Sequence, residues 1–241
     1  MNYNWNWSIY WVPSPEGGGT YLDLLLAGLW TTLLTAALAW AVAFTVGSII
    51  GVLRSLPGGP ARALANTWVE LFRNIPLLVQ LFLWYFVLPE VVPKGVGDWL
   101  KQRNDAPFIT AVVGIGLFMS ARVAVQVAAG VGALPRGQLA AGLAMGLTLP
   151  QTYRYVLLPM AYRVILPPLT SEFINTIKNT SVALTIGLLE LTARARAMQE
   201  FSFQVFEAFA GATVGYLVVN LVATAAMRML ERRLKLPGYG G

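Results

Sequence analysis

Residues 134–169 read LPRGQLAAGLAMGLTLPQTYRYVLLPMAYRVILPPL, and this segment decides how the chain is organised. It lies between two strongly apolar stretches, yet it carries three arginines and no acidic residue. Pro150 and Pro159 are expected to interrupt it, because proline lacks an amide donor and clashes with the preceding helical turn. We therefore predict short helices with a basic face, which lie between membrane spans and are bound by another protein.

The composition excludes an ordinary soluble domain and most catalytic chemistry. The chain is 56% hydrophobic and 12% charged, whereas globular proteins are about 25% charged. Cysteine and histidine are absent, so the commonest metal ligand and the bases of Ser-His or Cys-His catalysis are missing. The phosphate-binding pattern G-x-x-x-x-G-K-[ST] is also absent from the sequence. We expect no metal, no cofactor and no enzymatic activity.

Apolar stretches long enough to cross a bilayer recur along the chain. A transmembrane helix needs about 20 predominantly apolar residues. Five stretches meet this requirement: residues 24–53, 65–87, 108–133, 163–189 and 208–227. Pro76 is expected to kink the second of them. The sequence thus predicts an all-α integral membrane protein with about five transmembrane helices.

The basic residues predict the orientation of these spans. Lysine and arginine outnumber acidic residues in 54–62, in 134–163 and in the C-terminal tail, whereas the connections 89–107 and 190–200 are balanced. Since cytoplasmic loops carry the excess of Lys and Arg, the N-terminus is expected outside and the C-terminus inside. Residues 1–20 are rich in Tyr and Trp and are expected to rest at the external membrane interface or to form a flexible terminus.

Polar side chains inside two predicted spans require an explanation, because an ionisable group at membrane depth normally faces a cavity or a partner. Arg122 lies midway along 108–133, and Gln126 follows one turn later on the same helix face. A polar stripe on 163–189 recurs every three or four positions: Glu172, Asn175, Lys178 and Asn179. Either these residues line a water-accessible route for a charged solute, or Arg122 and Glu172 form a buried ion pair that fixes helix packing.

Segment 134–169 also resembles a known signature, the cytoplasmic EAA loop of ABC-importer membrane subunits. The pattern is E-A-A, three residues, G, nine residues and I-x-L-P. Ala140-Ala141-Gly142 stand at the first three positions, Gly146 at the glycine and Val156–Pro159 at the end. Ala140 replaces the glutamate of the pattern.

Further segments extend the resemblance to most of residues 20–235. Residues 70–80, ELFRNIPLLVQ, resemble the F-R-G-T-P-L-L-V-Q segment of polar amino acid permeases, and 175–181, NTIKNTS, resemble their K-D/N-T/S-S segment. Taken together, the chain resembles the histidine/glutamate-type permease family and, within it, the glutamate/aspartate permease subunits. One departure concerns residues 124–128, where many relatives have A-E-I-x-R and this chain has AVQVA.

The resemblance implies a domain plan and a set of partners. It implies an ABC type I importer permease domain over 21–235 with a coupling loop at about 134–163 and a cytoplasmic tail at 236–241, in the inner membrane of a bacterium. The implied partners are a second permease subunit (the same chain or a paralogue), two ATP-binding subunits, an external solute-binding protein, an amino acid substrate and membrane lipid. No nucleic acid partner is expected.

Two groups of residues are the candidates for function. Arg122 stands where many relatives have Tyr, and a cation there suits an anionic substrate. The substrate-path candidates are Arg122, Gln126, Glu172, Asn175, Lys178, Asn179 and Ser181. The candidates for coupling to the ATPase are Ala140, Ala141, Gly146, Leu147, Leu149, Gln151, Tyr155 and Pro159.

Other functions stay open from the residues alone. The permease could carry glutamine, asparagine or a basic amino acid in place of glutamate or aspartate. A secondary carrier and an intramembrane enzyme are the alternatives from other classes. Carriers usually contain internal repeats, which five spans do not provide. An intramembrane protease would need paired aspartates, but Asp23, Asp98 and Asp105 lie outside mid-membrane positions.

Overall fold

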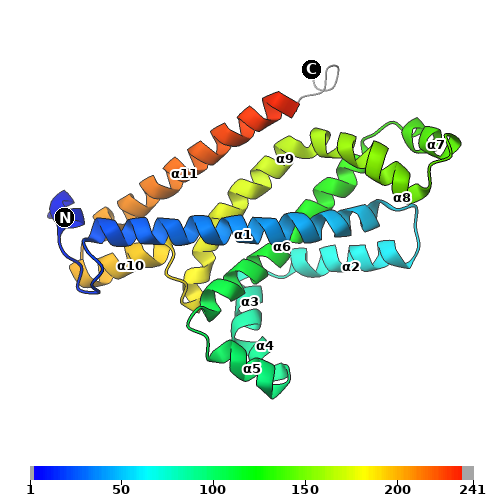
Figure 1. Cartoon of the computed structure of the whole chain (residues 1–241). Helices are drawn as coiled ribbons and strands as arrows, with labels where there is room; N and C mark the ends of the chain where they lie inside the picture. The colour runs from blue at the N-terminus through cyan, green and yellow to red at the C-terminus, as the bar shows by residue number, and fades with distance from the viewer. Residues whose placement is uncertain (1–2, 235–241) are drawn as a thin grey trace. The chain divides into compact units, whose positions relative to one another are not determined.

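A computed structural model describes residues 3–234, and these residues fold almost entirely into helices (Figure 1). The α-helices longer than seven residues are α1 (Tyr21–Ser55), α2 (Pro60–Asn74), α5 (Lys94–Lys101), α6 (Ala106–Gly132), α7 (Gly137–Ala144), α9 (Leu158–Asn179), α10 (Leu191–Ser202) and α11 (Val205–Leu234). Shorter helical pieces are η1 (Trp7–Trp11), α3 (Leu77–Phe82), η2 (Leu83–Val87), α4 (Leu88–Val91), α8 (Leu149–Thr152), η3 (Tyr153–Leu157) and η4 (Thr180–Ile186). An isolated β-bridge joins Pro13 and Thr20. The predicted all-α class is confirmed.

The described residues form two compact units. The first unit contains residues 3–40, 76–116 and 175–222, and the second contains 41–75, 117–174 and 223–234. Four helices, α1, α6, α9 and α11, contribute residues to both units. The predicted tail, 236–241, lies outside the described residues.

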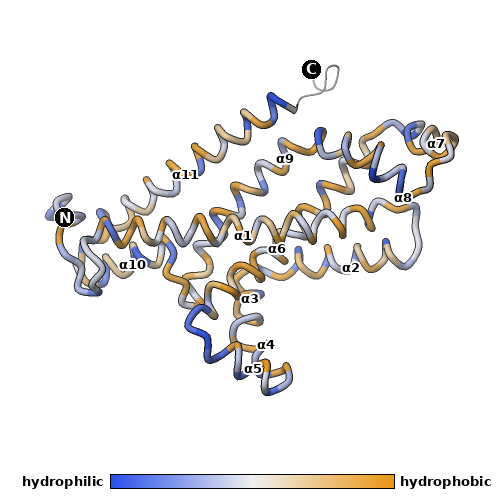
Figure 2. The backbone as a smooth tube through the Cα atoms, in the orientation of Figure 1, coloured by the Kyte–Doolittle hydropathy of each residue, from blue (hydrophilic) through white to orange (hydrophobic). Residues whose placement is uncertain are grey.

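Three helices among residues 3–234 are long and apolar enough to cross a membrane: α1, α6 and α11. Their backbones are coloured mostly as apolar in Figure 2, whereas the loop between α5 and α6 stands out as hydrophilic. A fourth span is possible if α2 and the segment Leu77–Val91 are counted together, but this pair bends by 100°. Helix α2 ends before Ile75 and α3 begins after Pro76. The expected kink within one helix is therefore an interruption between two helices.

The predicted span 163–189 differs most from the structure. Helix α9 ends at Asn179 and is followed by the 3-10 helix η4. Arg163 and Glu172 lower the hydropathy of α9, and among the described residues it does not qualify as a span by length and composition. The structure therefore supports three or four spans by this criterion, where the sequence predicted about five.

Pro159 does not end a helix, contrary to expectation, whereas Pro150 lies in the first turn of α8. The chain remains helical through Pro159 because the preceding turn, η3, is a π-helix. The amide of Leu158 donates to the carbonyl of Tyr153, five residues back. The same arrangement precedes Pro89, where the amide of Leu88 donates to Leu83. A π turn widens the helix locally, which removes the clash that proline makes with a regular turn.

Each unit has its own apolar core. In the first unit, Ile9, Tyr21 and Leu25 pack with residues of α10 and α11, including Leu191 and Met198. In the second unit, a cluster of Leu134, Tyr153, Leu157 and Ala161 packs against side chains from the end of α1 and from α7 to α9. This second cluster holds the segment that the sequence singled out, which is therefore part of a packed structure.

The N-terminal segment is held by hydrogen bonds to the start of α11. The backbone amide of Asn6 donates to Glu207 Oε1 at 2.7 Å, and the Tyr10 hydroxyl donates to the Glu207 carbonyl at 2.6 Å. The Tyr3 hydroxyl also donates to the Glu207 carboxylate. These contacts hold residues 3–10 against α11, while the place of this segment at the membrane interface stays a prediction.

Candidate functional site

Arg122 and Glu172 face one another within the second unit. Arg122 Nη1 lies 3.8 Å from Glu172 Oε2, with 45% of the arginine side chain exposed and 12% of the glutamate side chain exposed. The guanidinium carbon also lies 5.5 Å from the centre of the Phe118 ring. A direct hydrogen bond between such groups measures about 2.7–2.9 Å. The ion pair is therefore loose, and much of the guanidinium is accessible to another anion.

The exposure of Arg122 follows from the packing of α6. On a different face of this helix, Val123 and Val127 are fully buried against Gly47 and Gly51 of α1. An added Cβ at either glycine would meet a valine carbon at 2.6 Å, so the close approach of the two helices requires glycine. Arg122 lies off this contact face and Gln126 is half-buried one turn away.

Ser120 anchors α6 from a second direction. It is fully buried, its hydroxyl donates to the Leu117 carbonyl at 2.6 Å, and it accepts from Trp68 Nε1 at 3.0 Å. Trp68 belongs to α2 and packs against Phe72 with the rings tilted by 35° and their centres 4.5 Å apart. These contacts fix the helix that carries Arg122 without using the guanidinium.

The remaining substrate-path candidates belong to the first unit. Asn175, Lys178 and Asn179 lie on the last turns of α9, and Ser181 lies at the start of η4. Lys178 is exposed, while Asn175, Asn179 and Ser181 are half-buried. The Ser181 hydroxyl donates to the Lys178 carbonyl at 2.8 Å, so its oxygen remains available as an acceptor. The structure thus places Arg122, Gln126 and Glu172 in one unit, where Arg122 and Glu172 face one another, and groups the other four candidates at the end of α9 in the other unit.

The predicted coupling segment contains a sharply defined turn. Helix α7 ends at Ala144, and Gly146 adopts φ +86°, a left-handed conformation that favours glycine. The Gly146 amide donates to Leu143 at 3.0 Å and the Leu147 amide donates to Gly142 at 3.2 Å, which closes the end of α7. Thr148 and Gln151 then form a capping box that starts α8. Figure 1 shows α7 and α8 joined by this turn.

The coupling candidates differ in exposure. Ala140, Ala141, Gly146, Gln151, Tyr155 and Pro159 are exposed, whereas Leu147 and Leu149 are half-buried. Leu149 packs against the core cluster of the second unit. The apolar side chains most available to a partner are Tyr155, which is 63% exposed, and Leu143 and Met145 on either side of the end of α7. Leu143 and Met145 were not among the expected residues, because they fall at the three unspecified positions that precede Gly146 in the pattern.

A basic cavity of about 1030 Å³ lies beside this segment in the second unit. Its charged lining residues are Arg54, Arg62, Arg136 and Glu70. Arg54 Nε donates to Asn66 Oδ1 at 3.0 Å, which holds one guanidinium at the wall. The excess of arginine makes the cavity favourable for anions.

A buried glutamate, Glu190, was not identified as important from the sequence. It was expected in an aqueous connection opposite basic residues, but it is fully buried and caps α10 by accepting from the Ala193 amide at 2.7 Å. It also accepts from the Tyr216 hydroxyl at 2.6 Å. Arg194 pairs with Glu16 and Arg196 pairs with Glu200, each at 2.8 Å. Glutamate is not among the residues that usually cap helix N-termini, so no local pattern indicated this role of Glu190.

Comparison with known proteins places these features in a family. Residues 24–236 match the family described as Binding-protein-dependent transport system inner membrane component. The chain belongs to this family. It is a permease subunit of an ABC importer, a non-catalytic component of the inner membrane.

Individual relatives match over nearly the full chain. The glutamate/aspartate import permease protein GltJ of Escherichia coli K12 is 45% identical over 244 residues, which cover 100% of this chain and 99% of GltJ. The glutamine transport system permease protein GlnP of the same organism is 34% identical over 96% of this chain and 98% of GlnP. The family resemblance that the sequence motifs carried is confirmed.

Solved structures support the same fold. A chain from the crystal structure of an amino acid ABC transporter with histidines matches with a TM-score of 0.75 and 30% identity, covering 88% of this chain and 95% of that chain. A chain of the MetNI methionine ABC transporter in an inward-facing conformation matches with a TM-score of 0.74 at 22% identity, covering 88% and 97%. The all-helical ABC importer permease fold is therefore established.

Proposed function

We propose that this permease subunit forms the translocation path for an acidic amino acid, glutamate or aspartate. The observation that carries the proposal is the half-exposed guanidinium of Arg122, which lies in an apolar helix and is not saturated by Glu172. A guanidinium can hold a carboxylate with two parallel hydrogen bonds. The basic cavity in the second unit and the name of the relative GltJ support the same class of substrate.

Lys178, Asn179, Glu172 and Ser181 complete the proposed path. Lys178 and Asn179 offer donors for the α-carboxylate of the substrate, and Glu172 or Ser181 offers an acceptor for its α-ammonium. Gln126 and Asn175 add neutral polar groups on the same two helices. These roles follow from charge complementarity. Glutamine, asparagine and basic amino acids are the competing substrates.

The experiment is transport by the reconstituted importer. The permease is assembled with a second permease subunit, two ATP-binding subunits and an external solute-binding protein, and uptake of labelled glutamate, aspartate, glutamine and asparagine is compared. We expect glutamate and aspartate to be taken up in preference to their amides. Preferred uptake of glutamine or asparagine would contradict the acidic substrate and leave the permease assignment intact.

We also propose that the turn between α7 and α8 docks on the ATP-binding subunit and transmits its movement. Leu143, Met145 and Tyr155 supply exposed apolar contacts, in the manner of a helix bound in a groove. A Cβ added at Gly146 would meet no heavy atom within 4 Å, so the left-handed φ, and not the surroundings, demands glycine. Gly146→Asp strains the turn and adds a charge, and we expect transport to be lost while membrane insertion stays normal. Native transport by this variant would contradict the docking role.

The proposed topology has five spans, with α9 and η4 as the fourth, the N-terminus and residues 1–20 outside, and the C-terminus inside. The uneven distribution of basic residues supports it. Asp98 is exposed on α5, which this topology places outside the cell. Because the chain has no native cysteine, Asp98→Cys gives a clean test with an impermeant thiol reagent. We expect labelling in intact cells. A position 98 that is labelled only after the membrane is opened would overturn the five-span order.

A further inference from the structure

A cavity in the first unit shares no lining residue with the substrate-path and coupling candidates. It has a volume of about 430 Å³ and is lined by η2, α4, α5 and the first turns of α6. Most of its lining is apolar, including Trp84, Leu88, Leu100, Ile109 and Val113. Its volume falls within the range of about 300–1,000 Å³ that is usual for ligand sites.

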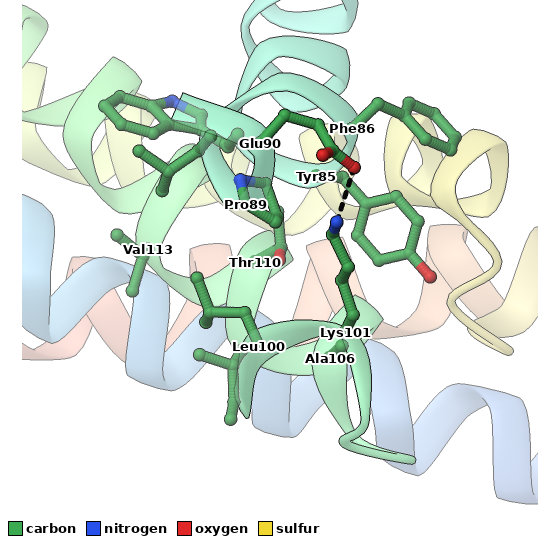
Figure 3. Close-up of a pocket in the computed structure, with 12 residues that line it drawn as sticks. Tyr85, Phe86, Pro89, Glu90, Leu100, Lys101, Ala106, Thr110 and Val113 are labelled. Carbon is green, nitrogen blue, oxygen red and sulfur yellow. Dashed lines mark ion pairs between the residues drawn. The ribbon is translucent and has the colours of Figure 1, made fainter. Parts of the chain in front are cut away.

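Two opposite charges stand at this cavity. Lys101 Nζ lies 2.5 Å from Glu90 Oε1, and the two side chains are 44% and 66% exposed. Figure 3 shows them pointing toward one another from α5 and α4, while Leu100 and Val113 line another part of the cavity. An exposed ion pair of this kind is weak, so a ligand with both charges can replace it at little cost.

The backbone keeps the two charges at the cavity. Gly97 of α5 is buried against α4, and an added Cβ there would clash with the Pro89 carbonyl oxygen. This contact closes α4 onto α5 and sets Glu90 and Lys101 side by side. Pro89 itself follows the π turn of η2, which displaces the aromatic residues of that turn.

We propose that this cavity binds a phospholipid with a zwitterionic, primary-amine headgroup, namely phosphatidylethanolamine. The ammonium of the headgroup replaces Lys101 beside Glu90, the phosphate pairs with Lys101, and part of an acyl chain fills the apolar cavity. Phe86 of the lining and two residues next to lining residues in the sequence, Val91 and Trp99, are exposed large apolar side chains, which suits a surface that lies against lipid. The bilayer surrounds this inner-membrane chain, so phospholipid headgroups and acyl chains lie next to it.

The chemistry favours a lipid over a free amino acid. Both ligands carry an ammonium and an oxyanion, but the acidic side chain of glutamate or aspartate would face the apolar lining unpaired. An acyl chain suits that lining. The primary ammonium also distinguishes phosphatidylethanolamine from phosphatidylcholine, whose quaternary ammonium has no N–H to donate to Glu90.

The test uses the full-length chain in detergent and native mass spectrometry. Binding of phosphatidylethanolamine, phosphatidylcholine and phosphatidylglycerol with identical acyl chains is compared. We expect preference for phosphatidylethanolamine, and an affinity about tenfold lower in the double variant Glu90→Gln/Lys101→Gln, because two charge-assisted hydrogen bonds are lost. Arg196→Gln is the matched control, since it breaks an equally exposed ion pair of the same unit, Arg196–Glu200, that lies outside the lining of this cavity.

A second variant tests the cavity itself. Val113→Trp fills the apolar lining and leaves Glu90 and Lys101 unchanged, and we expect it to weaken phosphatidylethanolamine binding as well. Equal binding of phosphatidylethanolamine and phosphatidylcholine, or unchanged binding by the double variant, would overturn the proposal. Displacement of the bound lipid by free glutamate would also overturn it, in favour of an amino acid site. None of these outcomes depends on which solute the importer carries.

Discussion

Two acidic residues of this chain, Glu190 in the first unit and Glu172 in the second, occupy opposite kinds of environment. Glu190 is fully buried and accepts hydrogen bonds of 2.7 Å from the Ala193 amide and 2.6 Å from the Tyr216 hydroxyl. Glu172 faces Arg122 at 3.8 Å, and nearly half of that arginine side chain is exposed. A carboxylate with short, fixed donors contributes to folding, whereas a loose pair with an accessible cation can exchange its partner for a ligand.

The difference has a local structural cause. Glu190 precedes α10 as its N-cap, so the backbone of the helix supplies a donor at a fixed position. Arg122 lies within α6, where the backbone amides are used by the helix itself, and side chains, Glu172 and Phe118, lie beside its guanidinium. The contrast therefore separates a structural charge from a functional one, and three measurements test it.

The largest effect is expected for Glu190→Ala. This substitution removes the N-cap, leaves the part-buried Ala193 amide without its side-chain acceptor, and leaves the Tyr216 hydroxyl with only its longer contact of 3.2 Å to Thr192 Oγ1. Together these losses are expected to cost about 3 kcal/mol of folding free energy. The amount of folded protein and its thermal stability in detergent measure the effect. The control is Glu190→Gln, whose amide oxygen can accept from the Ala193 amide while its NH2 group donates to the Tyr216 hydroxyl oxygen, so it should stay close to the wild type. Equal stability of all three proteins would show that Glu190 has no structural role.

A smaller effect on folding, with a clear effect on function, is expected for Arg122→Gln. A tightly buried pair broken on one side costs roughly 3–5 kcal/mol, but the long, exposed pair here should cost about 1 kcal/mol or less. Selectivity should change more: we expect the ratio of glutamate to glutamine uptake to fall about tenfold, which corresponds to ~1.4 kcal/mol.

The measurements for Arg122→Gln are expression, thermal stability and both uptake rates. Arg196→Gln on α10 is the control, because it breaks an exposed ion pair that involves neither Arg122 nor Glu172 and should change neither folding nor selectivity. A poorly folded Arg122→Gln protein would mean that Arg122, like Glu190, has a structural role. A well-folded variant with unchanged preference for glutamate would remove it from the substrate path.

The smallest expected effect is a change of folding stability with pH that comes from the carboxyl group of Glu190. This residue lies outside the membrane-spanning helices. Burial raises the pKa of its carboxyl above the ordinary value, and this outweighs the hydrogen bonds from Tyr216 and from the start of α10 that lower it. The folded state therefore binds the proton more tightly than the unfolded state does. The stability that this proton adds is fully present below the ordinary pKa and is lost as pH rises through the raised pKa.

The matching measurement compares the wild type with Glu190→Gln at several pH values. Glutamine does not titrate, so the melting temperature of the wild type relative to this variant should rise as the solution is acidified from neutral pH through the raised pKa. A relative melting temperature that falls on acidification would mean that the hydrogen bonds to the ionised carboxylate dominate over burial.

Much of this protein follows from the sequence alone, because the responsible interactions are local. The apolar stretches that became α1, α6 and α11 are visible in the composition of each stretch, since a helix satisfies its own backbone in a bilayer. The turn around Gly146 follows from residue types at fixed spacing, and so does the break at Pro76. The family resemblance rests on short segments of this kind, so it indicates the permease class without any knowledge of tertiary contacts.

The tertiary structure decided the environment of each charge. Tyr3 and Asn6 reach Glu207 across about 200 positions of sequence, and no local pattern predicts which side chains meet over that distance. The sequence offered both an ion pair and an open route for Arg122 and Glu172, and only their 3.8 Å separation and unequal exposure show a loose pair. The continuous helix through Pro159 also depended on a π turn that hydropathy does not encode. Hydropathy and spacing report what a segment prefers by itself, whereas burial and pairing depend on the other segments that pack against it.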